Sequence, residues 1–269
     1  MPLKEVVELI APSLVTLPLS STIKLTLSYL IRISRLVRIS LPDGMKICIP
    51  SMILSTAWNN ILHIYYHKDY ELIREYIPRN GWKVFDIGSF IGVWLLKVAQ
   101  YVGSNGLVIG FEPNPIAYRI AYVNVKLNGL RNVLLSNYAI GDYDGIKTLY
   151  MSEDLINSSF IEDYIVDMGR CIVSRRCTRM ITLEKALKMY NISRLDLVKI
   201  DVEGYEYNIL SSSRRILKDD FIKRLIIEVH KNVVQPKVIM DLLEDLGWNV
   251  VYIDLDLEVQ AFIYASKIE

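Results

Sequence analysis

The sequence predicts an α/β fold in which helices cover both faces of a mixed sheet, preceded by an N-terminal helical and β-hairpin extension. Beyond Trp82, short apolar segments alternate with helical segments, which is the pattern of βαβ units in a parallel sheet. These short segments are apolar almost throughout, as strands buried on both faces are. Hydrophobic residues make up 52% of the 269 residues, which is enough for a substantial core.

Residues 1–75 are expected to form the extension, and residues 76–269 a second domain. A charge-free run from Leu9 to Ile23 contains two prolines and is shorter than the roughly 20 apolar residues of a spanning helix. It also lacks the basic leader of a signal peptide. We therefore expect amphipathic helices that pack on their own protein. A peripheral membrane contact through residues 9–38 is the second interpretation, because basic amphipathic segments bind anionic lipid, and a spanning anchor is the least favoured.

A hairpin and a long helical stretch complete the extension. Pro42-Asp43-Gly44 is a strong turn sequence, and it separates the strand-like segments 36–41 and 45–49. The following residues, 52–78, are expected to be helical up to the turn sequence that begins at Pro78.

The second domain is expected to contain seven strands and five helices. The strands are placed at 83–87, 107–111, 133–140, 195–201, 224–230, 248–253 and 258–265. The helices are placed near 91–103, 115–128, 182–190, 204–217 and 235–246. The connection through Asp254-Leu255-Asp256 is too short for a crossover helix, so the last strand must be antiparallel and the sheet mixed.

Charge and cysteine content exclude several classes of protein. The chain has 31 basic and 30 acidic residues, so no overall field attracts it to nucleic acid. A local basic stretch over 170–179 is interpreted as a solvated face rather than a phosphate site. Three cysteines without CxxC spacing argue against a disulfide framework or a zinc ribbon. A reduced, cytoplasmic protein is expected.

The first strand of the second domain runs into a glycine-rich turn. Val84-Phe85-Asp86-Ile87-Gly88-Ser89-Phe90-Ile91-Gly92 has G-x-x-x-G spacing, not the G-x-G-x-x-G of a dinucleotide site. Gly88 allows a sharp turn and a close approach to a ligand, and Gly92 allows the next helix to pack near the strand end. Asp86 is expected at the carboxyl end of the strand, where open α/β sheets bind ligands, and its charge suits a cationic one.

The second strand ends in Phe111-Glu112-Pro113-Asn114-Pro115, which presents an acidic side chain at the next strand tip. A carboxylate there can accept both hydroxyls of a ribose. With Asp86, this favours S-adenosylmethionine over NAD or FAD. Asp142, after the third strand, is placed to accept from an adenine amine, or else it belongs to a plain turn; the sequence favours neither.

A third block of residues, together with two others, carries a resemblance to a known family. Lys199-Ile200-Asp201-Val202-Glu203-Gly204-Tyr205-Glu206, with the Glu112 block and Ile227-Glu228-Val229-His230, resembles the FkbM-type S-adenosylmethionine-dependent O-methyltransferases over roughly residues 65–230. Asn157-Ser158-Ser159 resembles a short polar segment of that family. The resemblance implies the class I methyltransferase (Rossmann-like) fold, whose seven-stranded sheet ends in an antiparallel hairpin.

Motif and resemblance together predict the residues of the site. The expected cofactor-binding residues are Asp86, Gly88, Ser89, Gly92, Glu112, Pro113, Asn114 and Asp142. The expected catalytic residues are His230, Asp201, Glu203 and Lys199, chosen from a set that also includes Glu206 and Glu228. His230 is the favoured proton acceptor because imidazole titrates near neutral pH, with a carboxylate to orient it. His63 and His67 are interpreted as ordinary helix residues.

Two other roles for the acidic residues stay open. Carboxylates and one histidine can hold a divalent metal that polarises the acceptor, although the favoured interpretation assigns no metal. Alternatively, Glu203 and Glu206 are charges that stabilise a helix N-terminus.

The predicted activity is O-methylation of a hydroxyl on a sugar, a lipid or another small or glycan acceptor. The alternatives are an RNA ribose methyltransferase, and a non-catalytic membrane-associated binding protein on the same fold. The sequence has no Asn/Asp-Pro-Pro-Tyr/Phe motif, and Lys199 with Asp201 is only half of the Lys-Asp-Lys-Glu set for ribose. A nucleic-acid partner is therefore not favoured.

Overall fold

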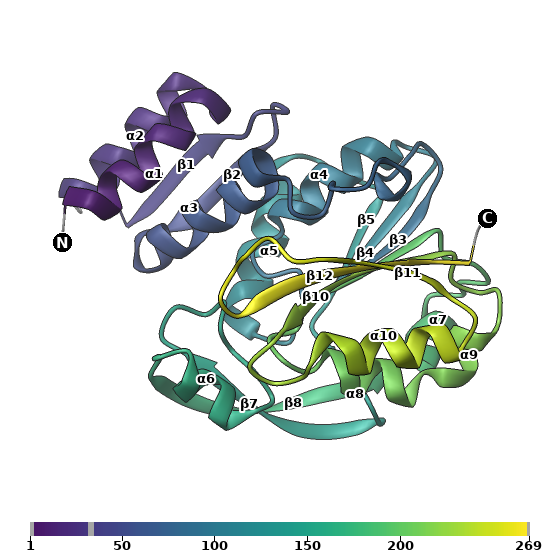
Figure 1. Ribbon diagram of the computed structural model, residues 1–269. Coiled ribbons are helices and arrows are strands. Elements are labelled where there is room, and N and C mark those ends of the chain that lie inside the picture. Colours follow the sequence, from purple (N-terminus) through teal and green to yellow (C-terminus); the bar gives the residue numbers. More distant parts are fainter. Residues whose placement is uncertain (1–2, 32–34, 268–269) are drawn as a thin grey trace.

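The computed structural model describes residues 3–31 and 35–267, and it confirms the predicted α/β class. A seven-stranded sheet has the order β11-β12-β10-β9-β3-β4-β5 (Figure 1). Its strands are β3 (Lys83–Ile87), β4 (Leu107–Phe111), β5 (Val133–Ser136), β9 (Leu197–Ile200), β10 (Arg224–His230), β11 (Asn249–Ile253) and β12 (Gln260–Ser266). β12 pairs antiparallel with both neighbours and the other pairs are parallel, so the sheet is mixed as expected.

Helices cover both faces of this sheet because its strands are buried on both sides. One hydrophobic cluster contains α4 (Val93–Val102) and α5 (Pro115–Leu127). The cluster on the opposite face contains side chains from α7 (Leu183–Met189), α8 (Glu206–Ser212), α9 (Arg214–Lys218) and α10 (Pro236–Asp245). The helix expected over 204–217 is thus two helices, which meet at Ser213.

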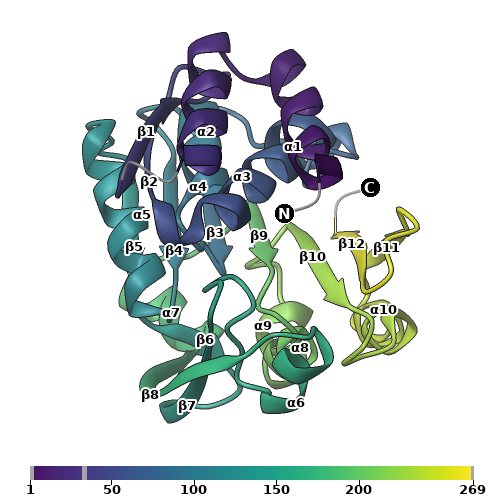
Figure 2. The ribbon, with the colours of Figure 1, turned by 90° about the vertical axis from the view of Figure 1, so that its left-hand side faces the viewer.

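The extension packs on the face that carries α4 and α5 (Figures 1 and 2). It comprises α1 (Leu3–Thr16), α2 (Leu19–Ile31), the hairpin β1 (Leu36–Ser40) and β2 (Lys46–Pro50), and α3 (Leu54–Leu62). Trp58 and Leu25 from the extension belong to the same core cluster as Val84 and Trp94 of the second domain. The two parts therefore share one core, and a domain boundary at residue 75 stays a prediction.

The prediction of one long helix over 52–78 is wrong in its second half. A 3-10 turn, η1 (Ser51–Ile53), leads into α3, and a π turn, η2 (His63–His67), ends at Lys68, which is left-handed. The chain then runs without regular structure to a short 3-10 turn, η3 (Arg74–Tyr76). Tertiary contacts explain the early end: Tyr264 donates to the Asp69 carbonyl, and the side chain of Tyr70 is directed to the ends of β9 and β10.

The third expected strand, 133–140, is also corrected. β5 ends at Ser136, and β6 (Ala139–Gly141) belongs to a separate sheet of order β6-β8-β7, with β7 (Gly145–Ser152) and β8 (Ile172–Thr182). A short helix, α6 (Glu162–Asp167), lies between β7 and β8 in the chain. The break has a local cause, because the Asn137 amide donates to the carbonyls of Glu112 and Pro113 and turns the chain.

The described helices are all too short or too polar to cross a membrane.

Candidate active site

The turn after β3 requires glycine at one position for a spatial reason. Gly88 has a φ of +83°, and a Cβ there would lie 1.7 Å from the carbonyl oxygen of Asp201. The N–H groups of Gly88 and Ser89 both donate to the carbonyl of Phe111. Gly92, at the N-cap of α4, lets this helix pack against Ala121 of α5. The turn thus joins the ends of β3, β4 and β9.

Asp86 and Lys199 form a buried ion pair between neighbouring strands. Lys199 Nζ lies 3.2 Å from Asp86 Oδ1 and 3.2 Å from Asp201 Oδ2, and it donates to the carbonyl of Gly88. Burial alone would lower the pKa of Lys199, but the two carboxylates raise it, so the ammonium stays charged. The cation that Asp86 contacts is therefore Lys199. The contact of Asp86 with the cofactor stays a prediction.

Glu112 ends β4 and is held by backbone donors. Its Oε2 accepts from Phe90 N at 2.7 Å, and its Oε1 accepts from Asn114 N at 2.8 Å. Burial raises the pKa of the Glu112 carboxyl to about 8, although these two backbone bonds oppose the shift. Asn114 caps α5 through Oδ1 and donates from Nδ2 to Ser158 Oγ, so the polar 157–159 segment lies beside the loop that carries Glu112.

These side chains surround one pocket at the carboxyl ends of the parallel strands. The extension contributes Asn60, Ile64 and Tyr70 to its wall. The second domain contributes, among others, Gly88, Ser89, Phe90, Glu112, Pro113, Asn114, Ala139, Ile140, Ser158, Lys199, Asp201 and Glu203. Among the described residues predicted for the site, four lie off this wall: Asp86, Gly92, Asp142 and His230. Asp142 accepts instead from the Tyr205 hydroxyl, and its contact with adenine stays a prediction.

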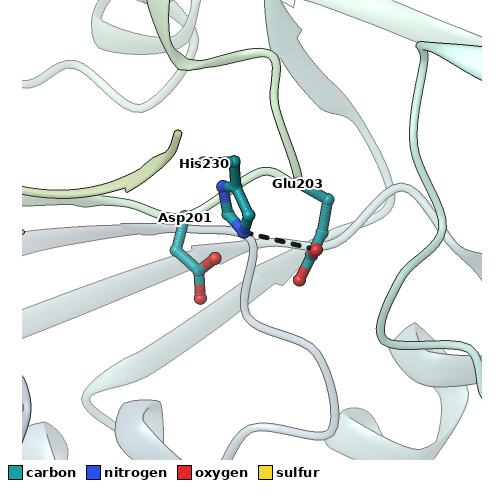
Figure 3. A group of neighbouring side chains, drawn as sticks. All are labelled: Asp201, Glu203 and His230. Carbon is teal, nitrogen blue, oxygen red and sulfur yellow. Dashed lines mark ion pairs between the residues drawn. The ribbon is translucent and has the colours of Figure 1, made fainter. Parts of the chain in front are cut away.

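Asp201, Glu203 and His230 lie close together (Figure 3). The two carboxylates line the pocket, and the histidine does not. One possible ligand atom from each lies within 4.8 Å of the others. The way in which the chain brings these side chains together differs from what the sequence led us to expect. β9 does not continue past Ile200; the chain turns through left-handed Glu203 and Gly204, and this turn brings the Glu203 carboxylate back to His230.

His230 is fully buried between two carboxylates. Its Nδ1 lies 2.8 Å from Glu206 Oε1, and its Nε2 lies 3.3 Å from Glu203 Oε2. Burial alone would lower the pKa of His230, but Glu206 and Glu203 raise it well above the usual value. His230 lies behind the pocket wall, and its role as the proton acceptor stays a prediction.

Glu206 lies in the first turn of α8, as one interpretation of the sequence expects, but it is not exposed there. Its side chain is fully buried, and Oε1 accepts from the N–H groups of Val202 and Gly204 as well as contacting His230. Glu206 therefore fixes both the turn after β9 and the orientation of the histidine ring.

Comparison with known proteins agrees with this architecture. The profile of the methyltransferase FkbM domain matches residues 86–250, which is more than half of the chain. The chain belongs to the FkbM methyltransferase family. It is accordingly a methyltransferase, and its cofactor is S-adenosylmethionine. No curated protein sequence matches the chain significantly.

A solved FkbM methyltransferase supports this fold at low sequence identity, and two further solved structures are similar to the chain more weakly. The FkbM methyltransferase from Methylobacillus flagellatus is 14% identical, with a TM-score of 0.50 over 81% of this chain and 55% of that one. An S-adenosylmethionine-dependent methyltransferase from Aquifex aeolicus is 15% identical, with a TM-score of 0.45 over 76% of this chain and 88% of that one. Fibrillarin from Aeropyrum pernix, solved with natively bound S-adenosylmethionine, is 14% identical, with a TM-score of 0.46 over 86% and 94%.

In this FkbM methyltransferase, sequence reasoning missed two tyrosines of the site. Tyr70 Oη lies 2.9 Å from Asp201 Oδ2 and 2.5 Å from Glu228 Oε2. One hydroxyl proton cannot serve both carboxylates, and burial raises the pKa of Glu228 to about 8, so a neutral Glu228 donates to Tyr70, which donates to Asp201. Tyr164 donates to Glu203. Both tyrosines lie outside the motif blocks, so no pattern marked them.

Proposed function

We propose that this FkbM methyltransferase transfers the methyl group of S-adenosylmethionine to a hydroxyl oxygen of a sugar, a lipid or another small or glycan acceptor. The observation that carries the proposal is the position of Asp201 and Glu203. Both carboxylates line the pocket, on the same wall as Gly88 and Lys199 and together with Glu112. A methylase that acts on oxygen needs a group to take the hydroxyl proton beside the cofactor, and these acids supply it.

The reaction balances with the groups present. The oxygen lone pair attacks the methyl carbon, the C–S bond breaks, and its electron pair returns to sulfur. The hydroxyl proton passes to Asp201 or Glu203. The sulfonium is already activated, so alignment of the two reactants supplies most of the acceleration. Asp201 has one oxygen, Oδ2, engaged by Tyr70 and Lys199, while Oδ1 accepts no hydrogen bond from the described residues.

Lys199 and His230 hold the two pocket carboxylates, Asp201 and Glu203, in position. Lys199 bridges Asp86 and Asp201, and so keeps the Asp201 carboxylate ionised and directed to the pocket. His230, held by Glu206, positions Glu203. We expect His230→Ala to lower kcat at least tenfold while the dissociation constant of the cofactor changes less than twofold. Unchanged turnover in this variant would exclude a positioning role for the histidine.

The decisive experiment supplies cofactor labelled in the methyl group together with fractionated host glycans, lipids and RNA. Label in a glycan or lipid fraction, as an O-methyl group by NMR, supports the proposal. Label in RNA would replace it with the ribose alternative, for which the exposed arginines of β8 offer phosphate contacts. Cofactor binding without transfer to any fraction would favour the non-catalytic alternative. Asp201→Asn should abolish transfer, whereas Glu244→Gln, on an exposed face of α10, should not.

A further inference from the structure

The cluster behind the pocket holds more negative than positive charge. The described residues of this cluster include five carboxyl groups (Asp86, Asp201, Glu203, Glu206 and Glu228) and two basic groups (Lys199 and His230). With Glu228 neutral, four carboxylates remain for two cations. Uncompensated carboxylates in a buried site are costly unless they are protonated or paired with a cation. The sulfonium of the cofactor supplies one positive charge, and the site still favours another.

A second observation shows where that charge belongs. The Nε2 atom of His230 is fully buried and makes no hydrogen bond with the described residues; its 3.3 Å contact with Glu203 lacks hydrogen-bond geometry. At the other side of the ring, Nδ1 faces Glu206. A histidine that donates Nδ1–H to a carboxylate directs the Nε2 lone pair outward, and this is the usual support of a metal-ligating histidine. Here Nε2 faces Glu203, and a divalent ion that binds this nitrogen would displace the proton that the metal-free imidazolium carries there.

We propose that Asp201, Glu203 and His230 bind a divalent metal ion, with Glu206 as the carboxylate that orients the histidine. Two carboxylate oxygens and one imidazole nitrogen form a mixed set that suits Mn²⁺ or Fe²⁺. Their mutual distances, within 4.8 Å, allow one ion to contact all three after small side-chain rotations.

The inference rests on the proposed function and deepens it. An ion held by Asp201, Glu203 and His230 would supply Lewis-acid chemistry: it would lower the pKa of an acceptor hydroxyl bound to it, and the released proton would pass to solvent. The oxygen then attacks the methyl carbon as the C–S electron pair returns to sulfur. The two pocket carboxylates act as ligands in this form of the mechanism.

The test is a titration of the full-length, chelator-treated protein with Mn²⁺, followed by the loss of the EPR signal of free Mn²⁺, in the presence of S-adenosylhomocysteine. We expect one saturable site. Glu203→Gln and His230→Asn should weaken Mn²⁺ binding at least tenfold, and Glu206→Gln by about 10- to 100-fold. Glu244→Gln is the matched control and should bind Mn²⁺ as the unmodified protein does. Binding of S-adenosylhomocysteine shows that each variant is folded.

Failure of this inference is separable from failure of the proposed function. The absence of saturable Mn²⁺ binding in the unmodified protein overturns the metal site, and so does a site that survives in both Glu203→Gln and His230→Asn. Methyl transfer that continues undiminished in the chelator-treated enzyme overturns the role of the ion while O-methylation stands. Transfer that is lost on chelation and restored by Mn²⁺ supports both.

A different observation carries a second inference, at the far end of the extension. The outward faces of α1 and α2 are apolar at helical spacing: Val7, Leu14, Val15, Leu19, Ile23 and Leu27 are 48–78% exposed. Their inward faces include polar side chains, because Ser13, Ser21 and Thr22 are buried and hydrogen-bonded. The buried leucines Leu9, Leu17 and Leu25 already pack the pair on its own protein, so that packing does not require a second, outward apolar row.

Charge and length indicate what covers this face. Lys24 of α2 is exposed, as are Arg35 and Arg38, which follow α2 in the chain. Helices of 14 and 13 residues are shorter than the ~30 Å hydrocarbon core at ~1.5 Å per residue. We infer that the α1–α2 face docks in the surface of an anionic lipid bilayer, with the helices parallel to it and the basic residues against the headgroups.

Co-sedimentation of the full-length protein with vesicles tests the inference. We expect binding to phosphatidylcholine vesicles that contain phosphatidylglycerol, and at least tenfold weaker binding to phosphatidylcholine alone. The double variant Val15→Glu/Leu27→Glu should lose binding at least tenfold. Val173→Glu, at a position 58% exposed on β8, is the matched control and should bind fully. Equal binding by the double variant overturns the inference, as does a lipid-free dimer that the double variant abolishes, since a second copy would then cover the face.

Discussion

Removal of the charge at Glu112 should change how cofactor binding depends on pH. In the ligand-free protein burial raises the pKa of Glu112 to about 8, with Asp86 raising it further and Lys199 opposing the shift. Ribose hydroxyls donate to a carboxylate, so the ligand binds the ionised form and pulls the proton off. Affinity must therefore increase as the pH rises toward 8 and level off above it.

The magnitude follows from the ionised fraction. A carboxyl with a pKa of about 8 is about 3% ionised at pH 6.5 and about 90% ionised at pH 9. If only the ionised form accepts the ribose, affinity rises about 30-fold over that interval, which is about 2 kcal/mol. In Glu112→Gln the amide stays neutral, so the corresponding rise should vanish and the affinity at pH 9 should be about 30-fold lower than in the unmodified protein.

Calorimetric titration with S-adenosylhomocysteine between pH 6.5 and 9 measures this effect. The amino group of the ligand titrates in the same window, but it does so for both proteins, so the difference between the two profiles isolates Glu112. Glu244→Gln should reproduce the unmodified profile. Parallel profiles for Glu112→Gln and the unmodified protein would refute the reasoning, because the carboxylate would then not be the ribose acceptor or would not titrate there.

Four further substitutions test the glycine turn, the buried ion pair and the shared core. Gly88→Ala should abolish cofactor binding and lower Tm by more than 10 °C, because the new Cβ would lie 1.7 Å from the Asp201 carbonyl oxygen. Gly92→Ala meets only an ordinary 3.4 Å contact and should cost about 1–2 kcal/mol of left-handed strain. Equal losses of Tm in the two variants would contradict this account. Lys199→Met should lower the free energy of unfolding, measured by urea denaturation, by about 3–5 kcal/mol, because it leaves Asp86 and Asp201 buried without their cation. A loss below about 1 kcal/mol would mean that Asp86 is neutral. Trp58→Ala should cost about 3–5 kcal/mol in one cooperative transition, because Trp58 is 1% exposed in the shared core; a separate early transition of the extension would indicate two independent domains.

The sequence by itself determined the class of the fold and several residues of the pocket wall. Strand-to-helix alternation after Trp82 placed all seven strands of the sheet, and the turn at Pro42-Asp43-Gly44 placed the hairpin. Gly88 and Glu112 were identifiable because local geometry dictates them: a left-handed turn demands glycine, and a strand tip exposes its side chain to ligand. Short-range constraints of this kind appear in any single sequence as residue type and spacing.

The catalytic side depended on contacts between residues far apart in the chain. Tyr70 and Asp201 are 131 positions apart, and no periodicity could join them or end α3 early to bring Tyr70 there. The same holds for His230, which the sequence could only treat as an isolated imidazole with its usual pKa. Burial and the carboxylates of Glu203 and Glu206 decide its charge. Sequence specifies residue types and local turns, whereas desolvation and charge pairing depend on every neighbour in space, so only the tertiary structure decided protonation, partners and the direction that each side chain faces.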